Sequence, residues 1–227
     1  MMRIDIISAT PTLLDSPLNT SIVKRAQNKG KCEIFIHDLR DFAFDKHKQI
    51  DDKPFGGGPG MLLKAEPFFE CIEKLQSERE YDTIILTTPK GKIFSQPEAN
   101  RLSLSQNIMI LSGHYKGIDD RVREKFVTDE ISIGNFILSG GELPALIIID
   151  AIVRLIPGVL NDSGSALNDS LIDDCTVEAP YFTRPAEYRG LKVPEVLLSG
   201  NDKKIAEWKN EQSKILTKKW KQINSLE

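Results

Sequence analysis

The first 160 residues alternate between two hydrophobic periods, and this alternation restricts the fold more than any other feature of the chain. Short apolar runs rich in Ile and Val recur, and amphipathic stretches lie between most of them. The runs occupy Ile4–Ile7, Cys32–Ile36, Ile84–Leu86, Ile108–Leu111 and Val127–Ile133. Strands and helices that alternate in this order build a parallel sheet with helices on both faces. The sequence therefore predicts an α/β fold.

Helix-start signals support this pattern. Ser95 to Glu98 reads S-x-x-E with Pro97 inside the first turn, which is a capping box. Pro67 and Pro144 stand at the beginning of two further amphipathic stretches, where proline favours the first turn of a helix. The three predicted helices cover Ala99–Leu104, Phe68–Leu75 and Ala145–Ile156.

Composition places the chain among cytoplasmic proteins. It has 227 residues, and its 30 basic and 33 acidic side chains give a net charge of -3. Three cysteines without a C-x-x-C pair argue against a disulfide framework and a zinc ribbon, and they fit a reducing compartment. The most apolar segment, Leu143–Leu160, is interrupted by Asp150 and Arg154, so we expect no membrane span.

The charge is distributed unevenly and divides the chain into three parts. Residues 1–160 carry 20 bases and 22 acids, residues 161–175 carry four acids and no base, and residues 176–227 carry ten bases and seven acids. The small, polar and acidic residues 161–175 bury too little apolar area to order themselves. We therefore expect a domain at 1–160, a flexible linker at 161–175 and a small C-terminal domain at 176–227.

The C-terminal part contains an amphipathic stretch, Asp202–Asn224. Within it, from Lys203 to Lys221, seven lysines face only two acids, Glu207 and Glu211. Asymmetry of this kind indicates an acidic partner, although a solvated helix face is the ordinary alternative. The seven candidate binding lysines are Lys203, Lys204, Lys209, Lys214, Lys218, Lys219 and Lys221.

Three loops rich in turn residues follow predicted strands: Thr87–Gly91, Gly113–Gly117 and Gly134–Pro144. In open parallel sheets, ligands bind beyond the carboxyl ends of the strands, where such loops gather. A fourth segment, Asp51–Met61, has four glycines in five positions but lacks the Lys-Ser/Thr of a P-loop. Ordinary βα turns and a mobile glycine-rich lid are the alternatives.

Composition and spacing identify no metal site and no nucleophile. His37, His47 and His114 have no metal-ligand spacing, and no G-x-S-x-G elbow is present. Taken alone, these observations indicate an α/β protein with a ligand site built from loops and a basic tail.

Longer strings of the sequence point to one family. PFGGGPGM, GHYKGIDDRV, SIGNFILSGGELPA, IPGVLNDSGS and YFTRPAEYRG…VPEVLLSGN follow one another along the chain, with the triplet Asn168-Asp169-Ser170 between the last two. Together they strongly resemble the bacterial tRNA (guanine-N1-)-methyltransferases, the TrmD family of the SPOUT class. The similarity covers nearly the full chain.

This resemblance implies a fold, a reaction and partners. The fold is a SPOUT-like α/β domain with a C-terminal deep trefoil knot, followed by a small, mainly helical domain that binds tRNA. The reaction transfers a methyl group from S-adenosyl-L-methionine to N1 of guanosine 37, next to the anticodon. A homodimer shares each active site, and Mg²⁺ is a further cofactor of the family. The cofactor pocket it implies is lined by Thr87, Pro89, Gly113, Ile133, Gly134, Asn135, Phe136, Ile137, Leu138, Gly140, Gly141 and Pro144.

The resemblance also assigns two catalytic residues. Asp169 matches the family's proposed general base, although an Asp in an N-D-S string is more often a helix N-cap. Arg154 matches an arginine whose guanidinium stabilises or orients the guanine; an exposed helix charge is its ordinary role.

Four positions depart from the family's pattern. His114 stands where Arg is usual, Lys116 where Glu is usual, and Phe136 and Leu86 where Tyr is usual. Lys116 reverses a charge close to the expected sulfonium, so Asp119 or a residue of the second subunit is expected to compensate. Two rival functions stay open: a methyltransferase acting at another RNA site, and a knotted RNA-binding protein without catalysis.

Overall fold

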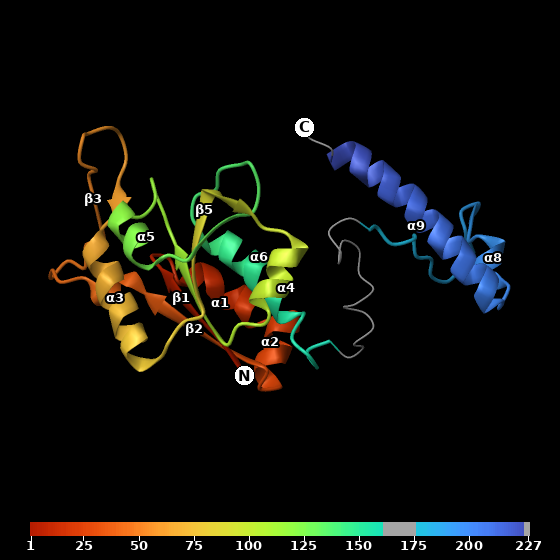
Figure 1. The fold of residues 1–227 in the computed structure, drawn as a ribbon, viewed down its shortest axis with the longest axis horizontal. Helices are drawn as coiled ribbons and strands as arrows, with labels where there is room; N and C mark the ends of the chain where they lie inside the picture. The colour runs from red at the N-terminus through yellow and green to blue at the C-terminus, as the bar shows by residue number, and fades with distance from the viewer. Residues whose placement is uncertain (161–175, 225–227) are drawn as a thin grey trace. The chain divides into compact units, whose positions relative to one another are not determined.

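The computed structural model describes residues 1–160 and 176–224, and the chain divides into two compact units, Met1–Asp162 and Ser163–Glu227. The first unit alternates strands and helices along the chain (Figure 1). Its order is β1 (Met2–Ser8), α1 (Thr12–Leu18), α2 (Ser21–Asn28), β2 (Cys32–Asp38), the 3-10 turn η1 (Leu39–Phe42), β3 (Asp51–Asp52), β4 (Leu62–Leu63), α3 (Ala65–Glu78), β5 (Thr83–Ile93), α4 (Gln96–Leu102), β6 (Asn107–Ser112), α5 (Asp120–Phe126), β7 (Asp129–Ser132) and α6 (Glu142–Val153).

Five of these strands form one sheet in the order β2-β1-β6-β5-β7, and every neighbouring pair is parallel. The register aligns Ile4 of β1 with Ile34 of β2 and with Ile108 of β6. Parallel neighbours require crossover connections, which the intervening helices supply. The predicted parallel sheet is therefore confirmed.

Alternate residues of the central strands feed two separate cores. Ile108 and Ile110 of β6 are fully buried in a core with α1, α2, α4 and α6. Met109 and Leu111 of the same strand are fully buried in a second core with α3 and α5. Figure 1 shows α3 and α5 on one side of the strands and α1, α2 and α6 on the other. Helices on both faces are thus confirmed, and the period of two along the strand explains them.

The predicted helix starts are near the observed ones. Pro67 and Pro144 lie in the first turns of α3 and α6. Ser95 is the N-cap of α4, but its side chain makes no capping hydrogen bond, so the predicted capping box is wrong. Glu98 instead accepts hydrogen bonds from Lys92 and Arg101. Two cationic donors hold this carboxylate more strongly than one backbone N–H would.

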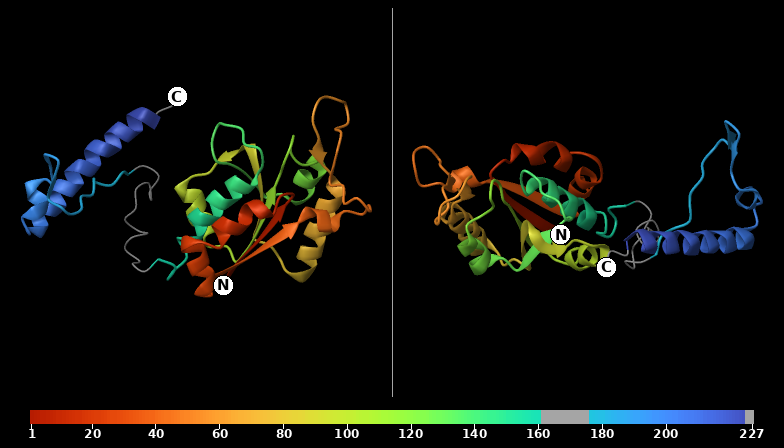
Figure 2. Two further views of the ribbon diagram at one scale, coloured as in Figure 1. Left: turned by 180° about the vertical axis from the view of Figure 1, so that it is seen from behind. Right: turned by 90° about the horizontal axis from the view of Figure 1, so that it is seen from above.

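The second unit contains a two-stranded sheet of β8 (Glu187–Tyr188) and β9 (Leu191–Lys192), then α8 (Glu195–Leu198) and α9 (Asp202–Asn224). Figure 2 shows α9 as one straight helix. The backbone N–H of Val177 donates to Thr217 Oγ1 at 2.9 Å, and Ser213 Oγ donates to Val177 O at 2.6 Å. These bonds attach the segment before β8 to the long helix. In neither described unit is any helix long and apolar enough to cross a membrane.

Candidate functional site

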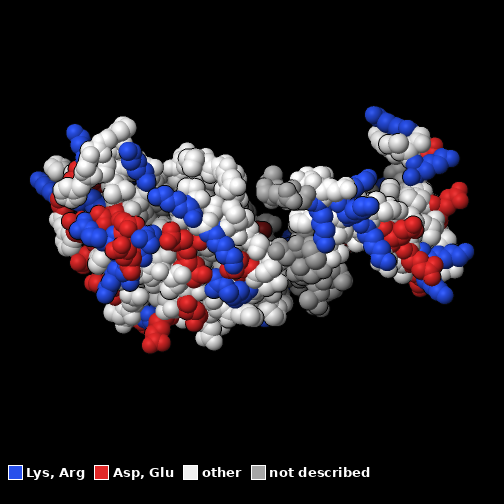
Figure 3. Space-filling model, turned by 45° about the horizontal axis from the view of Figure 1, so that its top comes forward, with Lys and Arg blue, Asp and Glu red and all other residues white. Residues whose placement is uncertain are grey.

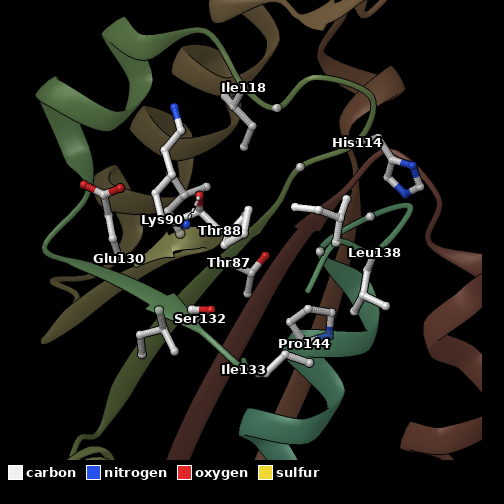
Figure 4. Close-up of a pocket in the computed structure, with 18 of the residues that line it drawn as sticks. Thr87, Thr88, Lys90, His114, Ile118, Glu130, Ser132, Ile133, Leu138 and Pro144 are labelled. Atoms are coloured by element: carbon white, nitrogen blue, oxygen red, sulfur yellow. Dashed lines mark hydrogen bonds between the residues drawn. The ribbon is translucent and has the colours of Figure 1, made fainter. Parts of the chain in front are cut away.

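A pocket of about 560 Å³ lies at the carboxyl ends of β5, β6 and β7. Most of its lining comes from the three segments that the sequence singles out as turn-rich (Figure 4). The predicted cofactor residues among its lining are Thr87, Pro89, Gly113, Ile133, Gly134, Phe136, Ile137, Leu138, Gly140, Gly141 and Pro144. Asn135 is not among the lining residues.

The first lining segment differs from the prediction. Thr87–Gly91 is not a loop after a strand, because β5 continues to Ile93. The pairing of β5 with β7 shifts register between Thr87 and Lys92, so the intervening residues bulge out of the ladder. Bulges of this kind interrupt strand pairing and re-aim side chains beside binding sites. The turn residues in this string therefore form an irregular strand at the pocket wall.

The other two segments meet at Gly141. Its backbone N–H donates to Gly113 O at 2.8 Å, which joins the loop before α6 to the loop after β6. A Cβ at position 141 would lie 2.1 Å from Thr87 Oγ1 and 2.9 Å from Ser112 Cα. Any side chain here would therefore collide with two neighbouring strands. Glycine is required for close approach of three backbones.

The chemistry of the lining fits a nucleoside-like ligand. Backbone groups of Gly113, Gly140 and Gly141 lie next to exposed apolar side chains, among them Ile137 and Leu138. Pockets for small ligands are mostly apolar, with a few polar groups that fix orientation. Ser112 Oγ is buried beneath this lining and has no hydrogen-bond partner. The lining therefore suits the adenosine and methionine parts of S-adenosylmethionine.

The acidic residues that line the pocket do not include Asp119, which was expected to compensate for Lys116. Asp119 does not line the pocket; it caps α5 and pairs with Arg121 at 2.8 Å, and the hydrogen bond from Arg121 lowers its pKa. Asp120 and Glu130 do line it, but both pair with Arg123. Compensation for Lys116 by Asp119 is therefore not supported.

Lys116 lines the pocket, and its side chain turns toward the glycine-rich loop that the sequence identifies. A Cβ at Gly58 would lie 3.4 Å from Lys116 Nζ, and one at Gly60 would lie 3.3 Å from Lys116 Cε. The backbone N–H of Lys116 donates to Met61 O at 3.1 Å. The loop after β6 is thereby attached to the segment after the glycines.

The predicted catalytic residues lie elsewhere. Arg154 is half-buried at the C-cap of α6, about 15 Å along the helix axis from Pro144 at the pocket. The described residues of one chain therefore do not bring Arg154 to the pocket. Asp169 lies outside the residues that the structure describes.

Sequence reasoning missed a buried carboxylate beside the pocket. Glu142, the first residue of α6, is 1% exposed and lies 2.8 Å from His114 Nε2, whose ring lines the pocket. An acid directly after Gly140-Gly141 at a helix start is a signal for this position, because helix N-termini favour negative charge.

All seven candidate lysines lie on α9 and are exposed. At 3.6 residues per turn, four of them fall within about 60° of the helix circumference: Lys203, Lys214, Lys218 and Lys221. The half-buried residues Ile205, Gln212 and Leu216 lie roughly opposite them on α9. In Figure 3, Lys and Arg side chains project from the C-terminal unit, with acidic side chains between them.

Comparison with known proteins identifies the family. The family model of tRNA (Guanine-1)-methyltransferase TrmD matches residues 2–223. The tRNA (guanine-N(1)-)-methyltransferase of Bacteroides thetaiotaomicron is 56% identical over 218 residues, which cover 96% of each chain. The protein of the same name from Chlorobium chlorochromatii is 52% identical over 217 residues, covering 96% of this chain and 94% of its own.

This chain belongs to the tRNA (guanine-N1)-methyltransferase family. The resemblance inferred from the sequence motifs is thereby confirmed. Membership makes the chain a methyltransferase that modifies N1 of guanine in tRNA, and it implies S-adenosylmethionine as the methyl donor. A non-catalytic RNA-binding protein does not agree with this membership.

Proposed function

We propose that this enzyme binds S-adenosylmethionine in the pocket at the ends of β5, β6 and β7, and methylates guanosine 37 next to the anticodon. The observation that carries the proposal is the convergence of three glycine-containing segments, distant in sequence, on one cavity of about 560 Å³. The family membership supports the donor, and the pocket's backbone-rich, apolar lining suits it. When bound there, S-adenosylmethionine supplies an electrophilic methyl group.

The polypeptide is threaded in this proposal as a C-terminal trefoil knot. General folding rules disfavour threaded chains, so the proposal depends on specific contacts. Two contacts support it: Gly141 donates to Gly113 O, and Gly140 pairs with His114 as an isolated antiparallel bridge. The segment after β7 therefore runs tightly against the end of β6 before it enters α6.

Deprotonation of guanine N1 is the task of a base, and Asp169 takes that role in our proposal. The guanine N1 is protonated at neutral pH, so it becomes a nucleophile only as its proton leaves. We assign to Arg154 the stabilisation of the negative charge that develops on guanine O6 during this step. A planar guanidinium with several donors suits that oxygen.

In this proposal, a homodimer brings Arg154 to an active site. Because α6 separates Arg154 from its own pocket, the site needs the Arg154 of a second copy. The apolar outer face of α6 supports such pairing: Leu143 is 53% exposed and Ile147 is 49% exposed, and they lie one helical turn apart. Exposed apolar faces of this kind mark interfaces.

We assign residues 1–160 to cofactor binding and residues 176–227 to tRNA binding in the cytoplasm; the expected linker, residues 161–175, lies outside the residues that the structure describes. The exposed lysines of α9 contact phosphates in this assignment. Phosphate contacts hold RNA in position and make binding dependent on salt, but they do not read its sequence.

The Mg²⁺ that the family resemblance implies has no matching residues in the described part of the chain. No group of three or more His, Cys, Asp or Glu side chains there is arranged to hold a metal ion. We therefore derive no step through a metal, and we expect any Mg²⁺ requirement to follow the tRNA.

The decisive experiment replaces the proposed base. Asp169→Asn keeps the size of the side chain but cannot accept the N1 proton, so we expect methylation to fall by about 10²-fold or more. Isothermal titration should show unchanged affinity for S-adenosylmethionine. Asp162→Asn, a matched change in the same acidic segment, serves as the control. Mass spectrometry of tRNA digests locates the methyl group.

Two outcomes would contradict the proposal. Full turnover by Asp169→Asn would show that another group removes the N1 proton. A methyl group found on a nucleotide other than guanosine 37 would support the rival that acts at another RNA site.

A further inference from the structure

The glycine-rich segment between β3 and β4 has no role in the chemistry described above. Figure 1 shows it as a loop that projects from the first unit. The N–H group of Gly57 closes a turn by donating to Pro54 O at 3.2 Å. Among the described residues, the N–H groups of Gly56, Gly58 and Gly60 have no acceptor, and all three glycines are exposed. The loop therefore offers three backbone donors to an anion.

A lysine from a different loop lies beside these donors. A Cβ at Gly58 would be 3.4 Å from Lys116 Nζ, and a Cβ at Gly60 would be 3.3 Å from Lys116 Cε. In a P-loop, the lysine that follows the glycines in sequence binds phosphate together with backbone N–H groups. This chain lacks a lysine at that place in the sequence, but the loop after β6 brings one to the glycines in space.

Backbone hydrogen bonds hold Lys116 in this position. Its own N–H group donates to Met61 O at 3.1 Å, directly after the glycines. One residue further along, Gly117 O accepts from the N–H group of Leu63 at 3.0 Å. The loop after β6 and the glycine-rich segment are therefore joined along their backbones, and the lysine side chain lies between them.

The neighbouring acids do not neutralise Lys116. Asp119 pairs with Arg121 at 2.8 Å, and Asp120 pairs with Arg123 at 2.6 Å. In the part of the chain that the structure describes, the Lys116 ammonium has neither an ion pair nor a hydrogen bond, and the side chain is exposed. An ammonium group without a counter-charge, next to three N–H donors, suits a phosphate group.

The surroundings of these donors favour a phosphate of RNA. Lys116 also lines the cofactor pocket, so the donors lie at the edge of that pocket. Phe55, in the turn just before the glycines, is completely exposed. Sites for single-stranded RNA combine cationic groups along the backbone with exposed aromatic rings on which unpaired bases stack. A free carboxylate or inorganic anion would leave this ring without a partner.

We propose that Lys116 and the N–H groups of Gly56, Gly58 and Gly60 bind a backbone phosphate in the tRNA loop that carries the target guanosine. The inference rests on the proposed cofactor pocket, because the bound strand must place its guanosine there. This phosphate site lies in the first unit, and it adds to the phosphate contacts assigned to α9. It holds the substrate strand at the edge of the pocket.

Lys116→Gln tests the ammonium group. The loss of one phosphate contact should weaken binding of unmodified tRNA about three- to tenfold and reduce the slope of log affinity against log salt by about 0.7. Isothermal titration should show unchanged affinity for S-adenosylmethionine. Lys74→Gln, at an exposed position in the C-terminal half of α3, is the matched control and should leave both affinities unchanged.

Gly58→Ala and Gly57→Ala form a matched pair for the loop. The φ angles of +106° at Gly58 and +79° at Gly57 strain alanine at either position. The methyl group at position 58 would lie beside Lys116 Nζ, in the space of the phosphate, whereas the one at position 57 would have nothing within 4 Å. We expect Gly58→Ala to weaken tRNA binding at least about threefold more. Equal losses in the two variants would contradict a phosphate at these glycines.

An uncharged linkage in the tRNA tests the phosphate itself. The phosphates of the loop that carries the target guanosine are replaced one at a time by methylphosphonate. At one linkage, the wild type should lose about as much affinity as Lys116→Gln loses with unmodified tRNA. At that linkage, Lys116→Gln should show no further loss, because the two changes remove the same contact.

Two results would overturn the inference. Weaker binding of S-adenosylmethionine by Lys116→Gln, with unchanged tRNA affinity, would show that the ammonium group binds the carboxylate of the cofactor. Additive losses at every linkage would show that Lys116 contacts no phosphate of that loop. A wild type that does not bind S-adenosylmethionine, but whose tRNA affinity depends on Lys116, would contradict the proposed function instead.

Discussion

Asp5 shows how one residue can contribute stability that depends on pH. It is fully buried in β1 and accepts hydrogen bonds from Arg3, His37 and Tyr81. Burial alone would raise the pKa of this carboxyl group, but the three hydrogen bonds outweigh burial and lower the pKa to about 2. Burial and the bond to Asp5 also raise the pKa of Tyr81.

Asp5→Asn should therefore destabilise the protein by about 3 kcal/mol at pH 7, because it removes one partner of a buried ion pair. The folded pKa lies below the ordinary value near 3.9, so this stabilisation is fully present above about pH 4 and is lost as pH falls through about 2. Urea denaturation at several pH values measures it. The difference in the free energy of unfolding between the wild type and Asp5→Asn should become smaller in acid. A difference that stays constant with pH would contradict the role given to the Asp5 carboxylate. Asp15→Asn, at an exposed position, is the control.

At the scale of elements, the contact of β5, β6 and the segment before α6 decides whether the pocket exists. These three segments come closest to one another at Gly141. The neighbouring backbone at Ser112 and Gly113 cannot move away without disturbing the sheet. Close-packed interiors tolerate added volume poorly.

Gly141→Ala should cost about 2 kcal/mol or more in the free energy of unfolding and abolish measurable cofactor binding. Gly30→Ala is the matched control, because Gly30 has a φ of +61° but nothing within 4 Å of an added Cβ. Its cost should be about 1 kcal/mol, from backbone strain alone, with cofactor affinity unchanged. Denaturation measures the stability of the two variants, and isothermal titration measures their cofactor affinity. Equal losses in both variants would contradict a steric clash at Gly141.

At the scale of the whole molecule, charge separates the two units. The second unit carries the exposed lysines on α9, whereas the first carries the pocket. Cofactor affinity and tRNA affinity should therefore respond to different substitutions.

We expect the combined change of Lys203, Lys214, Lys218 and Lys221 to Gln to leave cofactor affinity unchanged and to weaken tRNA binding about tenfold or more. Each lost phosphate contact should reduce the slope of log affinity against log salt by about 0.7 to 0.9. Binding titrations at several salt concentrations measure this slope. The same number of Lys→Gln changes in the first unit, at Lys24, Lys46, Lys48 and Lys74, is the control. An unchanged slope in the α9 variant would assign α9 to packing rather than to RNA.

Local pattern was sufficient to predict the elements and their faces. The apolar runs became the five strands of the main sheet, and their period of two predicted a core on each side. Residue identity along the chain also indicated the family, since the glycine-containing strings are specific in themselves. The elements, their buried faces and the family motifs all depend on residues that are close to one another in the chain, and the sequence shows these directly.

Only the tertiary structure decided which distant residues touch. Ser8 and Glu142 are 134 positions apart, and no periodicity predicts their hydrogen bond. The same holds for the close approach of Gly141 to Thr87 and for the bulge inside β5. It also holds for Glu98, which accepts hydrogen bonds from Lys92 and Arg101 instead of capping α4. Such contacts depend on the path of the chain in three dimensions, and the free energy of a charge or a side chain depends on what that path brings beside it.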